Sequence, residues 1–345
     1  MYKLEELKEK DFDDFAQNHQ LNSIFQTSSW AAVKSNWTPF YIGVFEQKQI
    51  IGACMFICRK LPFGFSFAYA PRGPLLDFNN QALVHFFLKN ITHLLRKKKV
   101  ILAKIDPNLS LGYLNLDEKN SLASLQHNKN KYYLSTQYTR YCTQQMALKD
   151  SIQPRVQLPF PLHEDIDSRI PSKTKKKIKS CLKKDVIVVE EHTSSSLVSM
   201  VQFTEKRHHI NLRNTAYFDA LLHHFKDNSC VLSAYQNGTL ISSCLLVRSK
   251  NCVEILYSGY HDDYRKTDST YLLREQSIQW AKKQGCLYFN FGGVEGNLED
   301  GLFMFKSSFN PQLCLYIGEF DLLTIPICSR IISLLFPIIK NKISF

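Results

Sequence analysis

Two stretches of the chain, about 190 positions apart, carry the same pattern of apolar and polar residues. Tyr41–Lys60 reads YIGVFEQKQIIGACMFICRK, and Val231–Lys250 reads VLSAYQNGTLISSCLLVRSK. Each consists of a short apolar run, a polar turn and a second apolar run, which predicts a β-hairpin. The sequence Gln236-Asn237-Gly238 favours a tight turn because Asn and Gly tolerate positive φ angles. Three pairs of residues align between the stretches: Phe45 with Tyr235, Ile51 with Ile241, and Cys54 with Cys244.

The repetition continues downstream of both hairpins. After the first hairpin come FSFAYAPRGP, a run at residues 82–99 with apolar residues at helical spacing, and an apolar strand at Val100–Pro107. After the second come VEILYSGY, a helical run at residues 271–285, and a strand within Cys286–Gly293. The order hairpin, strand, helix, strand therefore occurs twice. This order predicts a mixed sheet in an α/β (α+β) fold.

The length of 345 residues fits about two domains. The repeated layout is that of the GNAT acyltransferase superfamily, so we expect two tandem GNAT-like domains. The expected limits are residues 1–150 together with 318–345 for the first domain and residues 151–317 for the second, with the C-terminal segment returning to the first. Between the repeats, NSLASLQHNKNKYYLS predicts a loop or an interdomain connection, and Ile170–Asp185 predicts a charged helix.

The net charge and the cysteines indicate which kind of partner and which cellular compartment to expect. The formal net charge of +12 favours an anionic partner, such as nucleic acid, a membrane surface or a phosphorylated substrate. The ten cysteines lack the spacing of zinc ligands, so we expect free thiols in a reducing compartment and no metal. The charged N-terminal segment has no secretory pattern, and no stretch of 18 uninterrupted apolar residues occurs, which predicts a cytoplasmic protein.

Five motifs along the chain resemble, in the same order, those of the Fem family of peptidoglycan aminoacyltransferases. FQTSSWAAVKSNW resembles the N-terminal segment of that family, AYAPRGPLLDF its PRGP segment, and KTKKKIKSCLKKDVIVVE its basic helix and following strand. FNFGGVEGN resembles its YDFGG motif, and GLFMFKSSFNPQLCLYIGEFDL its C-terminal motif. These segments are Phe25–Trp37, Ala68–Phe78, Lys173–Glu190, Phe289–Asn297 and Gly301–Leu322.

The resemblance implies an aminoacyltransferase that takes an amino acid from an aminoacyl-tRNA and attaches it to a peptidoglycan precursor. The acceptor would be lipid II or UDP-MurNAc-pentapeptide, and no cofactor is implied. The chain has no long charged heptad insertion in its second half. It therefore resembles the short family members, which have no coiled-coil arm.

The sequence departs from the family pattern at two of these motifs. The family's Asp in YDFGG is Asn290 in this chain, so that carboxylate is not available as a base. The family's arginines at the start of the basic helix are replaced by lysines, which cannot form the planar, two-pronged contact of a guanidinium group with phosphate.

The reaction joins an amine to an ester that is already activated, so the enzyme mainly has to position the amine and stabilise an oxyanion. A cation in a partly desolvated place would serve the second purpose. Lys306 lies between aromatic residues in FMFKSSF, and the resemblance assigns the matching family lysine to the aminoacyl-tRNA end and the transition state. We expect Phe305 and Lys306 to be the catalytic residues; the alternative is a surface lysine in a loop.

The acceptor carries a diphosphate and peptide carboxylates, which call for cations at separated points. The resemblance assigns acceptor binding to Lys34, Arg213, Tyr217 and Tyr257, with Arg207 as an alternative to Arg213. Arg213 and Tyr217 are four positions apart, which would place them on one face of a helix. The alternative for each is a solvated charge or a core tyrosine.

The basic helix offers a second anionic contact. Lys173, Lys175, Lys176 and Lys177 are candidates to bind tRNA or membrane phosphate, although a lysine-rich run is often only a solvated face. The apolar segment Leu322–Phe345 is interrupted by two prolines and flanked by basic residues, which favours a peripheral membrane contact over a span. The pairs His208-His209 and His223-His224 lack the partner spacing of a metal site.

Two alternatives to this function remain open. An acyl-CoA-dependent N-acyltransferase of the GNAT superfamily would need a glycine-containing turn for pyrophosphate before the long helix, but residues 261–270 contain no glycine. A non-catalytic tRNA- or membrane-binding relative would have no need to keep the sequence Phe305-Lys306.

Overall fold

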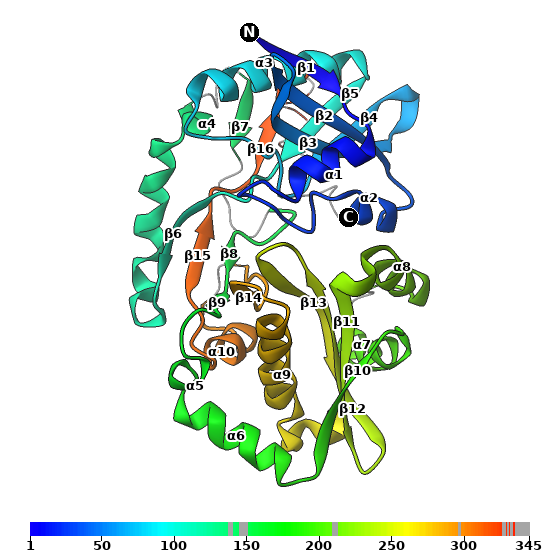
Figure 1. The fold of residues 1–345 in the computed structure, drawn as a ribbon, viewed down its shortest axis with the longest axis vertical. Coiled ribbons are helices and arrows are strands. Elements are labelled where there is room, and N and C mark those ends of the chain that lie inside the picture. The colour runs from blue at the N-terminus through cyan, green and yellow to red at the C-terminus, as the bar shows by residue number, and fades with distance from the viewer. Residues whose placement is uncertain are drawn as a thin grey trace. The chain divides into compact units, whose positions relative to one another are not determined.

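A computed structural model describes residues 1–136, 141–144, 151–208, 213–295, 298–325, 329, 331 and 334. The chain divides into two compact units (Figure 1). Unit 1 comprises Met1–Leu114, Glu118–Val156 and Cys314–Phe345, and unit 2 comprises Asn115–Asp117 and Gln157–Leu313. The domain limits expected from the sequence, residues 1–150 with 318–345 and residues 151–317, stay a prediction.

Unit 1 is built on a seven-stranded sheet with the strand order β1-β2-β3-β4-β5-β16-β7. Its strands are β1 (Tyr2–Glu6), β2 (Thr38–Glu46), β3 (Gln49–Lys60), β4 (Ser66–Ala70), β5 (Val100–Ile105), β16 (Phe320–Leu322) and β7 (Cys142–Gln144). Its helices are α1 (Glu9–Ala16), α2 (Ser28–Val33), α3 (Gln81–Lys97) and α4 (Tyr133–Thr136), with a 3-10 turn, η1 (Pro62–Gly64).

Unit 2 is built on a six-stranded sheet with the strand order β10-β11-β12-β13-β14-β9. Its strands are β9 (Pro159–Pro161), β10 (Val186–Glu191), β11 (Ser229–Gln236), β12 (Thr239–Arg248), β13 (Cys252–Tyr260) and β14 (Tyr288–Asn290). Its helices are α5 (Ile166–Arg169), α6 (Ser172–Leu182), α7 (Ser195–His208), α8 (Thr215–Phe225), α9 (Ser269–Lys283) and α10 (Gly301–Ser307), with η4 (Lys226–Asn228) and η5 (Asp262–Thr267). Helices α7 and α9 flank the sheet on either side (Figure 1).

The duplication predicted from the sequence is confirmed strand by strand. Strands β2 and β3 form the first hairpin and β11 and β12 the second, while β4 pairs in parallel with β5 and β13 with β14. Both hairpins have a register shift at the same place: Ile51 and Ile241 each stand as the extra residue of a β-bulge. A bulge at aligned positions is a specific feature, so the two hairpins correspond residue by residue.

Helices α3 and α9 each connect two parallel strands, and both have an apolar face that packs on the sheet. Asn80 caps α3, where its side chain accepts a hydrogen bond of 3.0 Å from the backbone N–H of Leu83. One face of α3 is buried against the sheet of unit 1, through Leu83, Val84, Phe87, Leu88, Ile91 and Leu95. In unit 2, α9 buries Leu272, Leu273, Ile278 and Ala281 in the same way.

The segment between the repeats differs from the expectation of a loop. Residues Leu116–Lys131 form a 3-10 helix, η2, which follows β6 (Ser110–Leu114). Its polar composition has no helical periodicity, but Leu122 and Leu125 are buried. The expected charged helix at Ile170–Asp185 is confirmed, with the shorter bounds of α6. A third, three-stranded sheet has the order β6-β15-β8, with β15 at Leu313–Tyr316 and β8 at Val156–Gln157.

Unit 1 contains a buried network of charged side chains that links β5 to the segment carrying β16. Lys104 Nζ lies 2.5 Å from Asp321 Oδ1 and 3.5 Å from Glu319 Oε2. Asp106 lies 3.1 Å from the guanidinium group of Arg72 and accepts a hydrogen bond of 3.2 Å from the Tyr69 hydroxyl. The positive and negative side chains therefore face each other in pairs.

Burial sets the protonation of this network. It raises the pKa of Asp106 to about 6 although Arg72 opposes the shift, and it raises the pKa of Glu319 to about 7 although Lys104 opposes it. Burial alone would lower the pKa of Lys104, but Asp321 and Glu319 outweigh it and raise that pKa. The family-like motifs PRGP and YIGEFDL are thus each tied by an ion pair to the segment Lys104–Asp106.

Candidate functional site

Lys306 lies in the last turn of α10, a short helix of unit 2. The helix starts at an N-cap, Asp300, whose side chain accepts a hydrogen bond of 2.7 Å from the backbone N–H of Phe303. The Lys306 ammonium donates a hydrogen bond of 2.9 Å to the backbone carbonyl of Gly293. The side chain is therefore held at both ends, by the helix and by the turn after β14, and is not a mobile surface lysine.

The surroundings of Lys306 disfavour its positive charge. Burial is the main cause that lowers its pKa, to about 8, and the guanidinium group of Arg274 adds to the effect, while Asp300 opposes it. At neutral pH the ammonium form still predominates. A desolvated ammonium group acts on a nearby oxyanion more strongly than a solvated one.

Asn290, which replaces the family's Asp, holds the turn on which Lys306 rests. Its side-chain amide donates to Gln157 Oε1 at 3.1 Å and to Glu254 Oε2 at 3.2 Å. Its side-chain oxygen accepts a hydrogen bond of 3.0 Å from the backbone N–H of Gly292, which has a φ of +79°. A side chain at residue 292 would be strained at this φ. Asn290 is therefore a positioning residue in this chain.

Aromatic rings line the same region of unit 2. Phe305, half-buried, packs edge-on against Tyr271, with 5.1 Å between ring centres. Phe309 stacks on Tyr271 at 5.8 Å and lies 5.2 Å from Phe291. The rings of Tyr271 and Phe309 contact Phe305, the residue that precedes Lys306, so α10 packs on an aromatic cluster of unit 2.

Arg274 is a functional candidate that the sequence analysis missed. It is only 7% exposed, and its Nη1 atom is buried without a hydrogen-bond partner among the described residues. Its Nη2 donates to the hydroxyl of Ser258 at 2.9 Å, and its Cζ lies 5.8 Å from the centre of the Phe305 ring. Within the described part of the chain, no carboxylate forms an ion pair with it. The available clue was a charged residue in the apolar stripe of α9.

Three of the expected acceptor-binding residues come together in unit 2. The Cζ of Arg213 lies 5.2 Å from the centre of the Tyr217 ring, and the hydroxyl of Tyr257 donates to that of Tyr217 at 3.4 Å. Burial is the main cause that raises the pKa of Tyr217, with Tyr257 adding to it. Arg213 precedes Asn214, the N-cap of α8, so it does not share a helix face with Tyr217 as expected. The two residues meet across the start of the helix.

Arg207, the alternative to Arg213, is tied to its own unit. Its Nη1 lies 2.5 Å from Asp262 Oδ1 and donates to the backbone carbonyl of Tyr260 at 3.2 Å. Its Cζ lies 3.9 Å from the centre of the Tyr260 ring. These contacts favour a structural part for Arg207 and leave Arg213 as the better acceptor candidate.

Lys34 lies in unit 1, at the C-cap of α2. It is 8% exposed, and its ammonium group lies 4.7 Å from the centre of the Trp30 ring. The loop before α2 is fixed by Gln26, whose amide donates to the carbonyls of Met55 at 3.1 Å and Pro71 at 2.9 Å. The motifs around residues 25–37 and 68–78 therefore meet, and together they set the place of Lys34.

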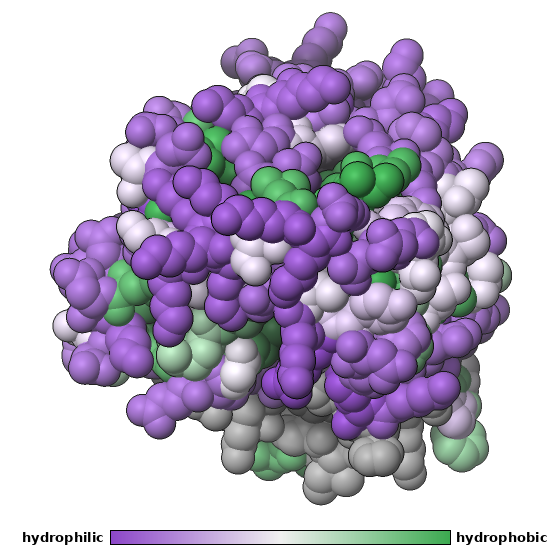
Figure 2. Space-filling view, turned by 90° about the horizontal axis from the view of Figure 1, so that it is seen from below, coloured by the Kyte–Doolittle hydropathy of each residue, from purple (hydrophilic) through white to green (hydrophobic). Residues whose placement is uncertain are grey.

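The lysines of α6 divide into two groups. Lys177 lies 3.3 Å from Asp268 Oδ1 and 4.1 Å from the centre of the Tyr271 ring, so it is engaged in contacts near the start of α9. Lys173 and Lys176 are exposed and Lys175 is partly so. Seen from below in Figure 2, the molecule presents mostly hydrophilic residues with small hydrophobic patches between them. The exposed lysines remain candidates for an anionic partner.

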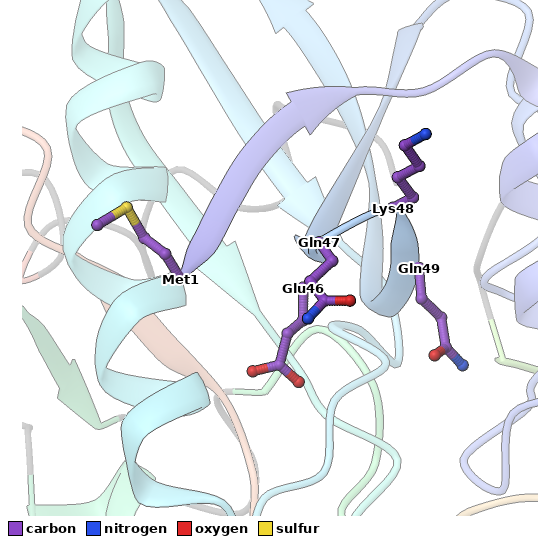
Figure 3. Close-up of a pocket in the computed structure, with 5 residues that line it drawn as sticks. All are labelled: Met1, Glu46, Gln47, Lys48 and Gln49. Carbon is purple, nitrogen blue, oxygen red and sulfur yellow. The ribbon is translucent and has the colours of Figure 1, made fainter.

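Other features of the described residues fall outside this site. A hollow of about 560 Å³ at the tip of the β2–β3 hairpin is lined by none of the predicted site residues (Figure 3). It is bordered by Met1, Glu46, Gln47, Lys48 and Gln49. Within the described ranges no group of three or more His, Cys, Asp or Glu side chains could hold a metal ion. The nine cysteines that are described are free thiols.

Two sequence predictions fall on residues that are largely not described. His209 and most of the segment 326–345 lie outside the described residues, so the expected membrane contact of Leu322–Phe345 stays a prediction. Of the helices in the described ranges, none has the length and apolar character that a bilayer span requires.

Comparisons with known proteins agree with the motifs. A family model described as the FemAB family matches residues 7–239 and 228–335. The chain is 26% identical over 330 residues to the UDP-N-acetylmuramoylpentapeptide-lysine N(6)-alanyltransferase of Weissella viridescens, with 90% of this chain and 92% of that protein covered. It is 22% identical over 387 residues to the lipid II:glycine glycyltransferase of Staphylococcus saprophyticus, with 90% of each covered.

Solved structures share the fold. The crystal structure of FemX matches with a TM-score of 0.79 at 17% identity and covers 97% of this chain and 100% of that one. A tandem GNAT protein from the clavulanic acid biosynthesis pathway matches with a TM-score of 0.54 at 9% identity, with 93% and 98% covered. The expected tandem GNAT-like fold is therefore confirmed.

Proposed function

Because this chain belongs to the FemAB family, we propose that it transfers an amino acid from an aminoacyl-tRNA to the stem-peptide amine of a peptidoglycan precursor. Two relatives that match over nine-tenths of the chain are named as an alanyltransferase and a glycyltransferase, which supports aminoacyl transfer in this chain. The tRNA donor is the finer part of the proposal. It is supported by the net charge of +12 and by the exposed lysines of α6.

The observation that carries the proposal is Lys306, a half-buried side chain whose ammonium group is held against the carbonyl of Gly293. In the reaction the acceptor amine forms a C–N bond to the ester carbonyl, the ester C–O bond breaks, and the amine gives up a proton while the ribose oxygen gains one. Negative charge gathers on the carbonyl oxygen before the C–O bond breaks. Lys306, which is held by Gly293 and mostly protonated at neutral pH, would donate a hydrogen bond to that oxygen.

The acceptor would be held by cations and hydroxyl groups. In unit 2, Arg213, Tyr217 and Tyr257 form one cluster that fits a carboxylate or diphosphate. Lys34 supplies a further cation from unit 1. One relative is named for a UDP-linked acceptor and another for lipid II, and both kinds of acceptor are consistent with this cluster.

An acyl-CoA donor fits the structure less well. The segment before α9, where a GNAT enzyme would bind pyrophosphate, is the 3-10 helix η5 with acidic Asp262 and Asp263 in its first turn. The glycine-containing turn that a GNAT enzyme would use there is missing, because residues 261–270 contain no glycine.

The direct test is a transfer assay with charged tRNAs and either precursor, followed by mass spectrometry of the acceptor. We expect the acceptor to gain the mass of one aminoacyl residue, and RNase treatment of the donor to abolish the gain. Product formation with acetyl-CoA alone would contradict the proposed donor.

A further inference from the structure

The turn that joins β3 to β4 exposes two phenylalanines. Phe63 is 97% exposed, the largest value for an apolar side chain among the described residues apart from Met1, and Phe65 is 38% exposed. Phe63 has a φ of +61°, a conformation that non-glycine residues seldom adopt. The turn projects from unit 1 beside β4 (Figure 1). An aromatic ring held out in water by a strained backbone needs an explanation beyond the fold itself.

A run of cations lies next to this turn. The backbone N–H of Ser66 donates to the carbonyl of Lys99 at 3.0 Å, and Ser66 pairs with Val100 in the parallel β4–β5 ladder. This register places the turn Pro62–Phe65 beside the exposed residues Arg96, Lys97, Lys98 and Lys99, with exposed Lys60 on the hairpin itself. Glu6 pairs with Lys98 at 2.6 Å, so part of that one charge is balanced.

We propose that the turn Pro62–Phe65 and the basic run Arg96–Lys99 together form a membrane-docking surface for anionic lipid. Phe63 and Phe65 would enter the interface between head groups and acyl chains, and the cations would contact lipid phosphates. Anionic lipid is favoured by charge complementarity, because an apolar protein partner would not neutralise four adjacent cations. The proposal of a docking surface is argued from the exposed rings and the strand register. Its biological purpose, access to a lipid-linked acceptor, rests on the proposed function.

The test uses vesicle flotation of the full chain without substrates. We expect binding to vesicles that contain phosphatidylglycerol, weaker binding to pure phosphatidylcholine, and loss of binding in high salt. Phe63→Ser should weaken binding about tenfold or more, since an aromatic ring loses its apolar surroundings. Each of Lys97→Gln and Lys99→Gln should weaken it about fivefold.

Matched control variants distinguish binding through this surface from non-specific binding to vesicles. Leu287→Ser removes another exposed apolar side chain, and Lys48→Gln removes an exposed cation at the tip of a different hairpin; neither should change binding. Phe63→Trp should keep binding and report it through a blue shift of added tryptophan emission. Because Phe63 is almost fully exposed, its substitution should leave the melting temperature unchanged.

The outcomes distinguish this proposal from the proposed function. Failure of the wild-type chain to float with anionic vesicles, or equal flotation of wild type and Phe63→Ser, would overturn the docking surface whatever the enzyme activity. Transfer to the soluble UDP-linked precursor should be the same in wild type and Phe63→Ser. Absence of transfer to every acceptor with normal vesicle binding would instead refute the proposed function and leave the surface standing.

Discussion

The two units share a fold but differ in whether their buried charged side chains form ion pairs. In unit 1, Lys104, Asp321, Arg72 and Asp106 meet in pairs of opposite sign. In unit 2, Arg274 is buried and has no carboxylate partner among the described residues, and the half-buried Lys306 has its pKa lowered by desolvation and by Arg274. Paired buried charges hold a structure together, whereas unpaired ones cost stability and are kept where they act on something else. The difference supports our proposal that the acyl-transfer chemistry lies in unit 2.

The largest expected effect concerns stability in unit 1. Lys104→Met would leave two carboxylates, Asp321 and Glu319, buried without their cation, and we expect a loss of about 3–5 kcal/mol in the free energy of unfolding. Urea unfolding followed by circular dichroism measures it. A second substitution, Asp321→Leu, should recover part of the loss. A change below about 1 kcal/mol in Lys104→Met would mean that the network is not structural.

Lys306→Met tests the role of a cation in unit 2 that has no ion-pair partner among the described residues. The substitution removes the charge but keeps length and apolar packing, so kcat should fall about a hundred- to a thousandfold while acceptor binding and stability are maintained. Single-turnover rates at saturating aminoacyl-tRNA measure the effect. If Lys306 only held the tRNA, the rate at saturation would be normal and the defect would appear as a salt-dependent KM.

Acceptor binding should depend on Lys34 and on Arg213. Lys34→Ala and Arg213→Ala should each weaken acceptor affinity about ten- to a hundredfold in calorimetry, because each removes a charge-assisted contact. Arg207→Ala is the matched control. Its side chain is engaged with Asp262, so its loss should lower stability and leave affinity nearly unchanged. The reverse pattern for Arg207 and Arg213 would exchange their roles.

The smallest expected effect is a shift in pH dependence. Lys306 must be protonated to stabilise an oxyanion, so activity should fall as pH rises through about 8. Arg274→Met removes a nearby positive charge and should move this fall to higher pH. The charged and polar groups near Lys306 are Arg274 from α9, Asp300 at the start of α10, and the carbonyl of Gly293. An unchanged profile in Arg274→Met would show that Arg274 acts only on packing.

The stability linkage of Lys306 has a definite sign. Its pKa in the folded protein lies below the ordinary lysine value of 10.5, so between about pH 8 and that value the unfolded chain binds the extra proton. This contribution therefore makes the folded protein more stable as pH rises through that range. Lys306→Met should abolish the contribution.

Local patterns allowed much of the fold to be predicted. The two hairpins and the crossover helices were recognisable because alternation and helical spacing depend on neighbouring residues, as for residues 82–99 and α3. The 3-10 helix η2 was missed because its sequence is mostly polar, and two buried leucines in sixteen residues are too few to show a helical period. Helix bounds were also uncertain at the start of α8, where the N-cap Asn214 excludes Arg213 from the helix.

The candidate site depended more on distant contacts. Lys306 was identified by resemblance, but its anchor at Gly293 and the support of that turn by Asn290 arise only when β14 lies beside β13. Arg274 was not singled out, although it is a charged residue in the apolar stripe of α9, because an arginine in a helix normally reaches solvent. The Phe63 turn also gave no signal, since exposure and the neighbouring basic run result from strand pairing.

The pairing of β16 with β5 has a consequence for how the chain is made. Asp321 lies 217 residues after Lys104 in the sequence, and the two form a buried ion pair. A ribosome therefore releases most of unit 1 and all of unit 2 before the strand that completes the first sheet exists. Until then the edge of β5 and the charge of Lys104 have no partner from β16, so the half that is synthesised first is expected to finish folding last.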